Sequence, residues 1–221
     1  MRAPRELWPL QAGAAIFDFD GTLADTAHIW HDVDRIFLSS RGLPFPAGYG
    51  EAIAALGFEQ GARYTIDLFR LDESVEDICD EWNAIGREMY QREVELRDGA
   101  ERYIRSLRSQ GIPCALATTN DVRVLSSMRN FDPNDLFDAC VYGAEVGKGK
   151  NEPDIYLEAA ARIGTRPQDR LVFEDIVVAV RTAHDIGMRT CGVRSSDPVQ
   201  RVDELRSLAD LWLEEWTVIA L

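Results

Sequence analysis

The sequence predicts an α/β protein in which a Rossmann-like, parallel-sheet core carries an inserted, all-helical cap domain. Short apolar runs alternate with amphipathic helical patterns over most of the 221 residues. Between the first and second apolar runs, however, about 70 residues show helical patterns alone, too many for an ordinary connection between strands. We therefore expect a core made of residues 1–25 and 98–221 and a helical cap at residues 26–97.

The candidate strands are apolar runs of the length expected for strands buried in a parallel sheet. The first, Ala14–Asp18, consists of small and apolar residues and ends in an acid. Because helical patterns separate the later runs, we expect a mostly parallel sheet with helices on both faces. The later candidates are Pro113–Thr118, Asp138–Tyr142, Leu171–Glu174, Thr190–Val193 and a weaker sixth, Asp210–Leu213.

The candidate helices have apolar residues at helical spacing and recognisable ends. In Ala100–Gln110, for example, Tyr103, Ile104 and Leu107 fall on one face, and Gly111 follows directly, as glycine does at a left-handed helix end. The other core candidates are Asp121–Asn130, Pro153–Ile163, Val177–Ile186 and Val199–Ser207. The cap candidates are His28–Arg41, Glu59–Leu71 and Ser74–Arg92.

Composition and charge narrow the classes of function. The formal net charge of −14 argues against nucleic acid and anionic membranes as partners, because proteins that bind these polyanions usually carry an excess of basic residues. No apolar run approaches the roughly 20 residues that span a bilayer, and the N-terminal stretch has no secretory signal pattern. We therefore expect a cytoplasmic protein. We also expect a monomer or weak dimer, although no sequence feature determines the oligomeric state. The four cysteines show no CxxC pairing and are expected to be inert thiols.

Polar residues follow several of the predicted strands, at the edge where parallel sheets bind their ligands. Two acids at the end of an apolar strand would be costly to bury in a protein core unless a cation lies between them. The residues that the topology brings to this edge are Asp18 and Asp20, Thr118 and Thr119, Lys148 and Lys150 in a Gly-rich loop, and Glu174 and Asp175.

Four stretches at this edge, DFDGTLADT, ALATTND, GKGKNEPD and VFEDI, are similar in order and spacing to the four motifs of the haloacid dehalogenase superfamily. More narrowly, the chain resembles the phosphatase branch related to β-phosphoglucomutase, which carries a helical, C1-type cap after the first motif. The resemblance implies a Mg²⁺-dependent phosphatase that hydrolyses a small phosphorylated metabolite through an aspartyl-phosphate. A phosphate monoester is a dianion that resists nucleophiles, so acids arranged around a hard cation suit this chemistry.

The resemblance assigns catalytic roles by position. Asp18 is expected to be the nucleophile, and Asp20 the general acid for the leaving group and then the general base for water. Thr118 corresponds to the hydroxyl that binds the phosphoryl oxygen. Lys150, chosen over Lys148 because the K-x-x-P-D-I-Y pattern aligns on it, is expected to offset the charge on Asp18 and the phosphate.

The resemblance also assigns metal and substrate contacts. Asp175 is the expected direct Mg²⁺ ligand, with Glu174 bound directly or through water, and Asp18 and the Asp20 carbonyl completing the set. Thr119, Asn120 and Thr26 are the candidate substrate-binding residues. An alternative for the TTND stretch is that it caps the helix expected from Asp121, and both readings are compatible because helix N-termini bind anions.

Other activities stay open. A β-phosphoglucomutase-like phosphosugar mutase is the main alternative, since Thr26 matches a hinge threonine of that enzyme, but Trp30 stands where its hinge histidine is expected. Asp20 together with Asp175 speaks against a dehalogenase, which needs neither the second acid nor a metal. A binding protein on a degenerate scaffold ranks lowest. The sequence does not identify the phosphate ester: sugar phosphates, a nucleotide monophosphate and phosphoglycolate all remain open as substrates.

Overall fold

The computed structural model describes residues 4–54, 56–197 and 200–220, and within them the predicted α/β fold is confirmed. Six parallel strands form one sheet in the order β3-β2-β1-β4-β5-β6, so the strand order reverses on either side of β1. The strands are β1 (Ala14–Phe17), β2 (Cys114–Thr118), β3 (Ala139–Tyr142), β4 (Arg170–Glu174), β5 (Arg189–Val193) and β6 (Leu211–Leu213).

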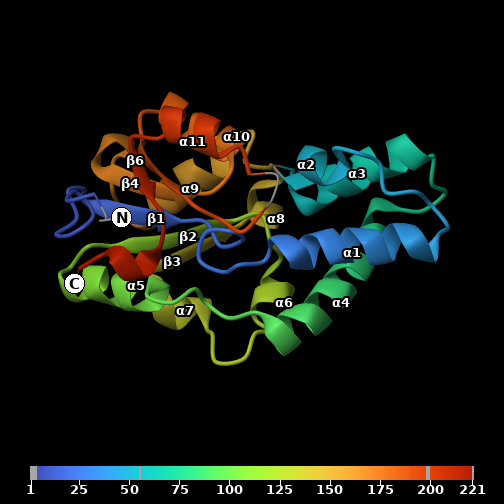
Figure 1. Ribbon diagram of the computed structural model, residues 1–221, viewed down its shortest axis with the longest axis horizontal. Coiled ribbons are helices and arrows are strands. Elements are labelled where there is room, and N and C mark those ends of the chain that lie inside the picture. Colours follow the sequence, from blue (N-terminus) through green and yellow to red (C-terminus); the bar gives the residue numbers. More distant parts are fainter. Residues whose placement is uncertain (1–3, 55, 198–199, 221) are drawn as a thin grey trace.

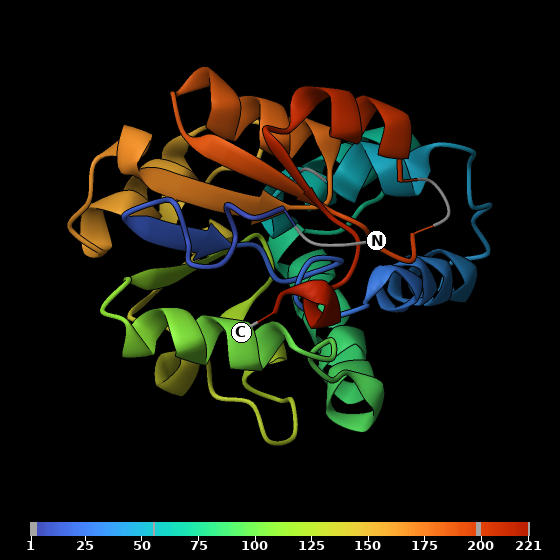
Figure 2. The same cartoon turned by 60° about the vertical axis from the view of Figure 1, so that its left-hand side comes forward.

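Helices cover both faces of this sheet because alternate strand residues point to opposite sides. On one side Ile16 and Val172 pack with helices α9 (Asp154–Arg162) and α10 (Val177–Asp185), and α11 (Val202–Leu208) lies against α10. On the other side Phe17 and Phe173 stack at 4.7 Å and pack near α5 (Ala100–Ser109). Figures 1 and 2 show these two layers above and below the sheet.

The cap consists of four helices that lie together at one end of the sheet (Figure 1). They are α1 (Ala27–Ser40), α2 (Tyr49–Ala54), α3 (Phe58–Phe69) and α4 (Val75–Glu93). Helix α1 buries an apolar face that includes Ile29, Val33 and Phe37 against α4, where the Phe37 ring meets Trp82 edge-on at 5.5 Å. His28 and His31 lie on its exposed side.

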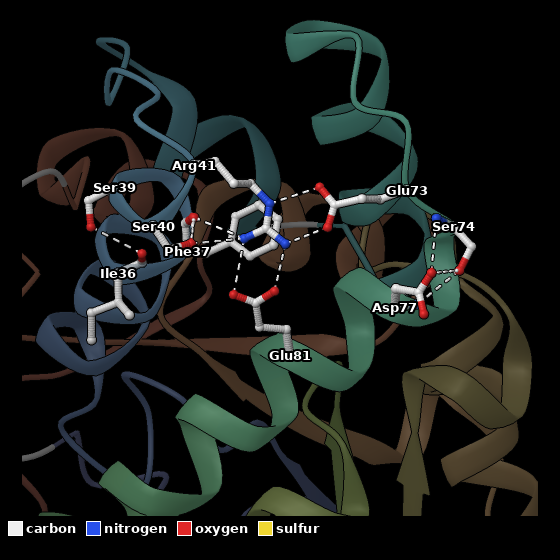
Figure 3. Close-up of polar contacts among 9 residues, drawn as sticks. All are labelled: Ile36, Phe37, Ser39, Ser40, Arg41, Glu73, Ser74, Asp77 and Glu81. Atoms are coloured by element: carbon white, nitrogen blue, oxygen red, sulfur yellow. Dashed lines mark hydrogen bonds and ion pairs between the residues drawn. The ribbon is translucent and has the colours of Figure 1, made fainter.

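A cluster of one arginine and two glutamates, Arg41, Glu73 and Glu81, joins the end of α1 to α4 and the residues just before it (Figure 3). The Arg41 guanidinium lies 3.8 Å above the Phe37 ring and donates to both Glu73 and Glu81, with its Nε 2.8 Å from Glu73 Oε2. Ser74 and Asp77 cap the first turn of α4 reciprocally. These contacts fix α1 and α4, the two longest cap helices, relative to each other. Helix α4 also carries Tyr90, which contacts the core residue Asp20.

Some local expectations are wrong. The helix predicted over Asp121–Asn130 is only α6 (Val122–Leu125), because the hydroxyls of Ser126 and Ser127 bond back to carbonyls of that turn and the chain leaves the helix. Helix α11 begins at Val202; the predicted start, Val199, lies outside the described residues. Short elements that the sequence did not predict are α2, α7 (Pro133–Leu136), α8 (Gly143–Val146) and the 3₁₀ turns Pro167–Asp169 and Trp216–Val218.

Two expectations about composition can be compared with the fold. All four cysteines are free thiols, three of them on strands β2, β3 and β5, as expected. Among the described residues, no helix combines the length and the apolar character needed to cross a bilayer.

Candidate active site

Three carboxylates meet at the carboxyl ends of β1 and β4. Asp18 directly follows β1, and its backbone N–H donates to the Phe173 carbonyl at 3.0 Å, which holds it against β4. Glu174 is the last residue of β4, and Asp175 follows it. Each of these three acids offers an oxygen within 4.8 Å of the others, and all are buried. This is the edge of the sheet where the strand order reverses, the usual ligand site of open α/β sheets.

A single lysine enters this cluster. Lys150, in the loop between α8 and α9, is 3% exposed and donates to Asp18 Oδ1 and, at 2.7 Å, to Glu174 Oε1. Although burial lowers the pKa of Lys150, the two carboxylates outweigh it and raise that pKa, so the ammonium stays charged. Tyr156 of α9 donates its hydroxyl to the same Glu174 oxygen at 2.7 Å. Lys148, in contrast, is exposed.

The charges in this cluster are not balanced. Asp18 Oδ2 and Glu174 Oε2 are buried and find no hydrogen-bond partner among the described residues, which is costly for carboxylate oxygens. Burial and the repulsion from Glu174 raise the pKa of Asp18 despite Lys150, and the same causes raise the pKa of Asp175 to about 8. Three acids therefore face one ammonium. Oxygen donors of this kind are the ligands that Mg²⁺ takes, so the residues present fit such an ion.

Glycine at position 21 makes the cluster possible. Gly21 has φ +78°, a left-handed conformation that side chains rarely adopt, and it lies against Asp175. A Cβ at this position would lie 2.0 Å from Asp175 Oδ2. The G of the DFDGT stretch therefore leaves the space that the Asp175 carboxylate occupies.

Asp20, two residues after Asp18, points toward the cap and receives four donors. Its Oδ1 accepts from the Thr26 hydroxyl at 2.7 Å, from the Trp30 indole at 2.9 Å and from the Tyr90 hydroxyl. Its Oδ2 accepts from the Asn120 amide at 2.9 Å. Thr26 and Trp30 lie at the start of α1 and Tyr90 lies on α4, so both long cap helices contact this one core carboxylate.

The remaining predicted residues line the adjoining loop after β2. Thr118 ends that strand, is 1% exposed, and accepts the Asn120 backbone N–H on its hydroxyl at 3.1 Å. Thr119 and Asn120 lie in the wall of a small cleft between core and cap. The cap side of this cleft includes Phe58, and its core side includes the exposed Lys148.

The structure thus separates the predicted residues into two groups. Asp18, Lys150, Glu174 and Asp175 touch or face one another, and Asp20 binds Thr26 and Asn120. Sequence reasoning missed Tyr90, Tyr156 and Gln200, whose side chain donates to the Asp175 carbonyl at 2.9 Å. Tyr156 closes the same K-x-x-P-D-I-Y pattern that selected Lys150 and could have been found there; Tyr90 and Gln200 lie in no motif.

Comparisons with known proteins agree with the fold and identify the family. A family model described as haloacid dehalogenase-like hydrolase matches residues 15–193. The chain is 34% identical to a probable pseudouridine-5'-phosphatase of Drosophila melanogaster over 181 residues, covering 79% of this chain and 78% of that protein. It is 27% identical to β-phosphoglucomutase of Bacillus subtilis over 218 residues, covering 92% and 95% of the two chains.

A solved structure shares the fold. CbbY from Rhodobacter sphaeroides, solved in complex with phosphate, superimposes with a TM-score of 0.77 at 21% identity and covers 93% of this chain and 95% of that one. The resemblance drawn from the four motifs is confirmed. This chain belongs to the haloacid dehalogenase-like hydrolases.

Proposed function

We propose that this protein is a Mg²⁺-dependent phosphatase that hydrolyses a small phosphorylated metabolite through an aspartyl-phosphate on Asp18. The observation that carries the proposal is the state of the Asp18 carboxylate. It is buried at the switch point of the sheet, and Lys150 donates to one of its oxygens, while the other has no hydrogen-bond partner in the part of the chain that the structure describes. A fixed carboxylate with one free oxygen is suited to attack phosphorus.

The residues of this chain supply the reaction steps. An Asp18 oxygen forms a bond to phosphorus while the bond from phosphorus to the ester oxygen breaks, and Asp20 gives its proton to that departing oxygen. Asp20 then takes a proton from the water that attacks the phosphoryl group, which frees Asp18 as inorganic phosphate leaves. Lys150 compensates negative charge in both steps because it stays charged between Asp18 and Glu174.

Asp18, Glu174, Asp175 and the Asp20 backbone carbonyl would hold the Mg²⁺ ion. Bound there, the ion would offset the charge of the phosphate and of the three acids. The unpaired oxygens of Asp18 and Glu174 support this ligand set. Thr118 and the Thr119 amide would bind the phosphoryl oxygens, and Asn120 and Thr26 would lie beside the substrate while they hold Asp20.

Two further features bear on the substrate and partners. Relatives are named for small phosphorylated compounds, among them the pseudouridine-5'-phosphatase and hexitol phosphatase B of Escherichia coli, which supports hydrolysis over a mutase reaction. The net charge of −14 favours neither nucleic acid nor anionic membranes as partners. We propose a monomer or weak dimer that acts in the cytoplasm.

A phosphate-release panel of metabolite esters tests the proposal. We expect release with Mg²⁺, none after chelation, and loss of at least about a thousandfold in kcat for Asp18→Asn, because the nucleophile is removed. The matched control is Asp67→Asn, the same change on the exposed face of α3. Exchange of hexose 1- and 6-phosphates without phosphate release would favour the mutase. Wild-type turnover by Asp18→Asn would refute the proposed nucleophile.

A further inference from the structure

We propose that Tyr90 of the cap is a positioning residue that orients the Asp20 carboxyl for proton transfer when the cap is docked on the core. The inference rests on the proposed function, in which Asp20 is the acid and base of phosphate ester hydrolysis. It adds a residue that belongs to none of the four motifs and lies 70 positions along the chain from Asp20.

The donors around Tyr90 determine where its proton points. The Asn120 amide oxygen accepts the Asp121 N–H at 2.7 Å, so the amide nitrogen faces Tyr90 and Asp20. That nitrogen and the Trp30 indole nitrogen each lie 3.0 Å from the Tyr90 oxygen, and both groups can only donate. The single Trp30 N–H is shared between Tyr90 and Asp20 Oδ1, whereas the Asn120 amide has a second hydrogen for the Tyr90 oxygen. The Tyr90 oxygen therefore acts as an acceptor toward these groups, and its one hydrogen is left for Asp20 Oδ1.

Packing holds the tyrosine in this place. Tyr90 is 0% exposed, and its ring lies 6.4 Å from the core residue Phe19 and 5.8 Å from Trp30. Burial, and next the negative charge of Asp20, raise the pKa of Tyr90, so the hydroxyl keeps its proton. A neutral tyrosine hydroxyl in a fixed rotamer is a donor of fixed direction.

The network also links the cap to the chemistry. Tyr90 and Trp30 come from α4 and α1, whereas Asp20 and Asn120 come from the core. The four groups meet only when the cap lies where the structure has it. Cap donors take up Oδ1, and a core donor takes up Oδ2. Displacement of the cap would remove the Oδ1 donors and leave the carboxyl free to rotate, so docking of the cap sets the orientation of Asp20.

Replacing the hydroxyl alone tests this role. Tyr90→Phe keeps the ring, and the matched control is Tyr49→Phe, which removes another buried cap hydroxyl, one that lies 2.7 Å from Thr65. We would measure kcat/KM with Mg²⁺ for two esters, an alkyl phosphate such as glycerol phosphate and 4-nitrophenyl phosphate. Because kcat/KM covers the steps up to leaving-group departure, it isolates the step in which Asp20 gives its proton.

The two esters separate positioning from stability. An alkoxide leaving group needs the proton, whereas nitrophenolate departs without it, so we expect Tyr90→Phe to lower kcat/KM about tenfold or more on the alkyl ester and no more than about twofold on the aryl ester. Tyr49→Phe should stay within about twofold of wild type on both esters. An equal loss on both esters in Tyr90→Phe, or no loss on either, would overturn the proposal.

A double-mutant cycle gives a second measurement. In an Asp20→Asn background, Tyr90→Phe should change kcat/KM on the alkyl ester by less than about twofold, because its effect passes through Asp20. Additive losses would contradict the inference. Should Tyr90→Phe fail to fold, Trp30→Phe removes another N–H from the same carboxylate and is subject to the same comparison. Absence of any phosphate release by the wild type would instead refute the proposed function.

Discussion

Gly21→Ala tests how closely the backbone of the first motif is fitted to the metal ligands. The added Cβ would lie 2.0 Å from Asp175 Oδ2 and 2.7 Å from the carboxylate carbon. Contact of ordinary length needs about 3.4 Å or more, so the Asp175 carboxylate has to move by about 1.4 Å. It cannot simply be pushed toward solvent, because Asp175 is only 6% exposed.

That displacement is large compared with what a metal site tolerates. Mg²⁺ sites hold their ligands at about 2.0–2.1 Å, with a tolerance of about 0.2 Å. A shift of about 1.4 Å therefore removes Asp175 from the ligand set. The φ of +78° adds about 1–2 kcal/mol of backbone strain for any residue with a Cβ. We expect the Mg²⁺ concentration for half-maximal phosphate release to rise by about tenfold or more, together with a lower stability.

The control separates strain from the clash. Gly111 has a similar φ of +76°, but no atom of the described residues lies within 4 Å of the position that a Cβ would take there. Gly111→Ala should therefore lose a comparable free energy of unfolding in urea and keep the wild-type dependence on Mg²⁺. Titration of phosphate release with Mg²⁺ for the two variants is the assay. Equal Mg²⁺ requirements in both variants would refute the reasoning.

Other substitutions test the charges of the cap and the site. Burial raises the pKa of Asp34, on α1, from 3.8 to about 7, so the folded chain holds a proton that the unfolded chain releases. Asp34 should therefore lower stability by up to about 4 kcal/mol as pH rises from about 4 to about 7. Asp34→Asn should remove that share of the pH slope in urea unfolding, whereas the raised pKa of Asp175 keeps a slope of the same sign; an unchanged slope would contradict this. Lys150→Met leaves Asp18 and Glu174 without their shared ammonium. In the absence of divalent ions it should lower the free energy of unfolding by about 3 kcal/mol, and an unchanged free energy would contradict a strong ion pair between Lys150 and these acids. Arg41→Met breaks the cluster that joins α1 to α4 and should lower the free energy of unfolding by about 1–2 kcal/mol. Thermal unfolding measures this change, and a melting curve equal to that of the wild type would contradict it.

The sequence predicted what depends on neighbouring residues and on sheet topology. Asp18, Glu174 and Asp175 end or follow apolar runs, and parallel strands place their carboxyl ends on one edge, so their meeting could be expected without coordinates. The position of Lys150 followed from a motif. The inserted helices were visible because no strand pattern interrupts them.

Contacts between distant segments could not be predicted in this way. The bond between Tyr90 and Asp20 depends on how α4 is set against the core, and no local pattern carries that information. Helix α2 is short and depends on packing, since Tyr49 at its start is buried and contacts Thr65 of α3. Helix α6 ends early because Ser126 bonds back into its only turn, which outweighs the helical spacing of apolar residues.

Identifying the residue that carries phosphorus during turnover tests the central claim most directly. Asp20→Asn keeps Asp18 but lacks the base that activates water, so mixing this variant with Mg²⁺ and 4-nitrophenyl phosphate, followed by acid quenching and peptide mass analysis, should trap the intermediate. We predict a phosphoryl group on the peptide that contains Asp18, and none when Asp18→Asn is added. A phosphoryl group on another residue, or an adduct that survives Asp18→Asn, would contradict the account.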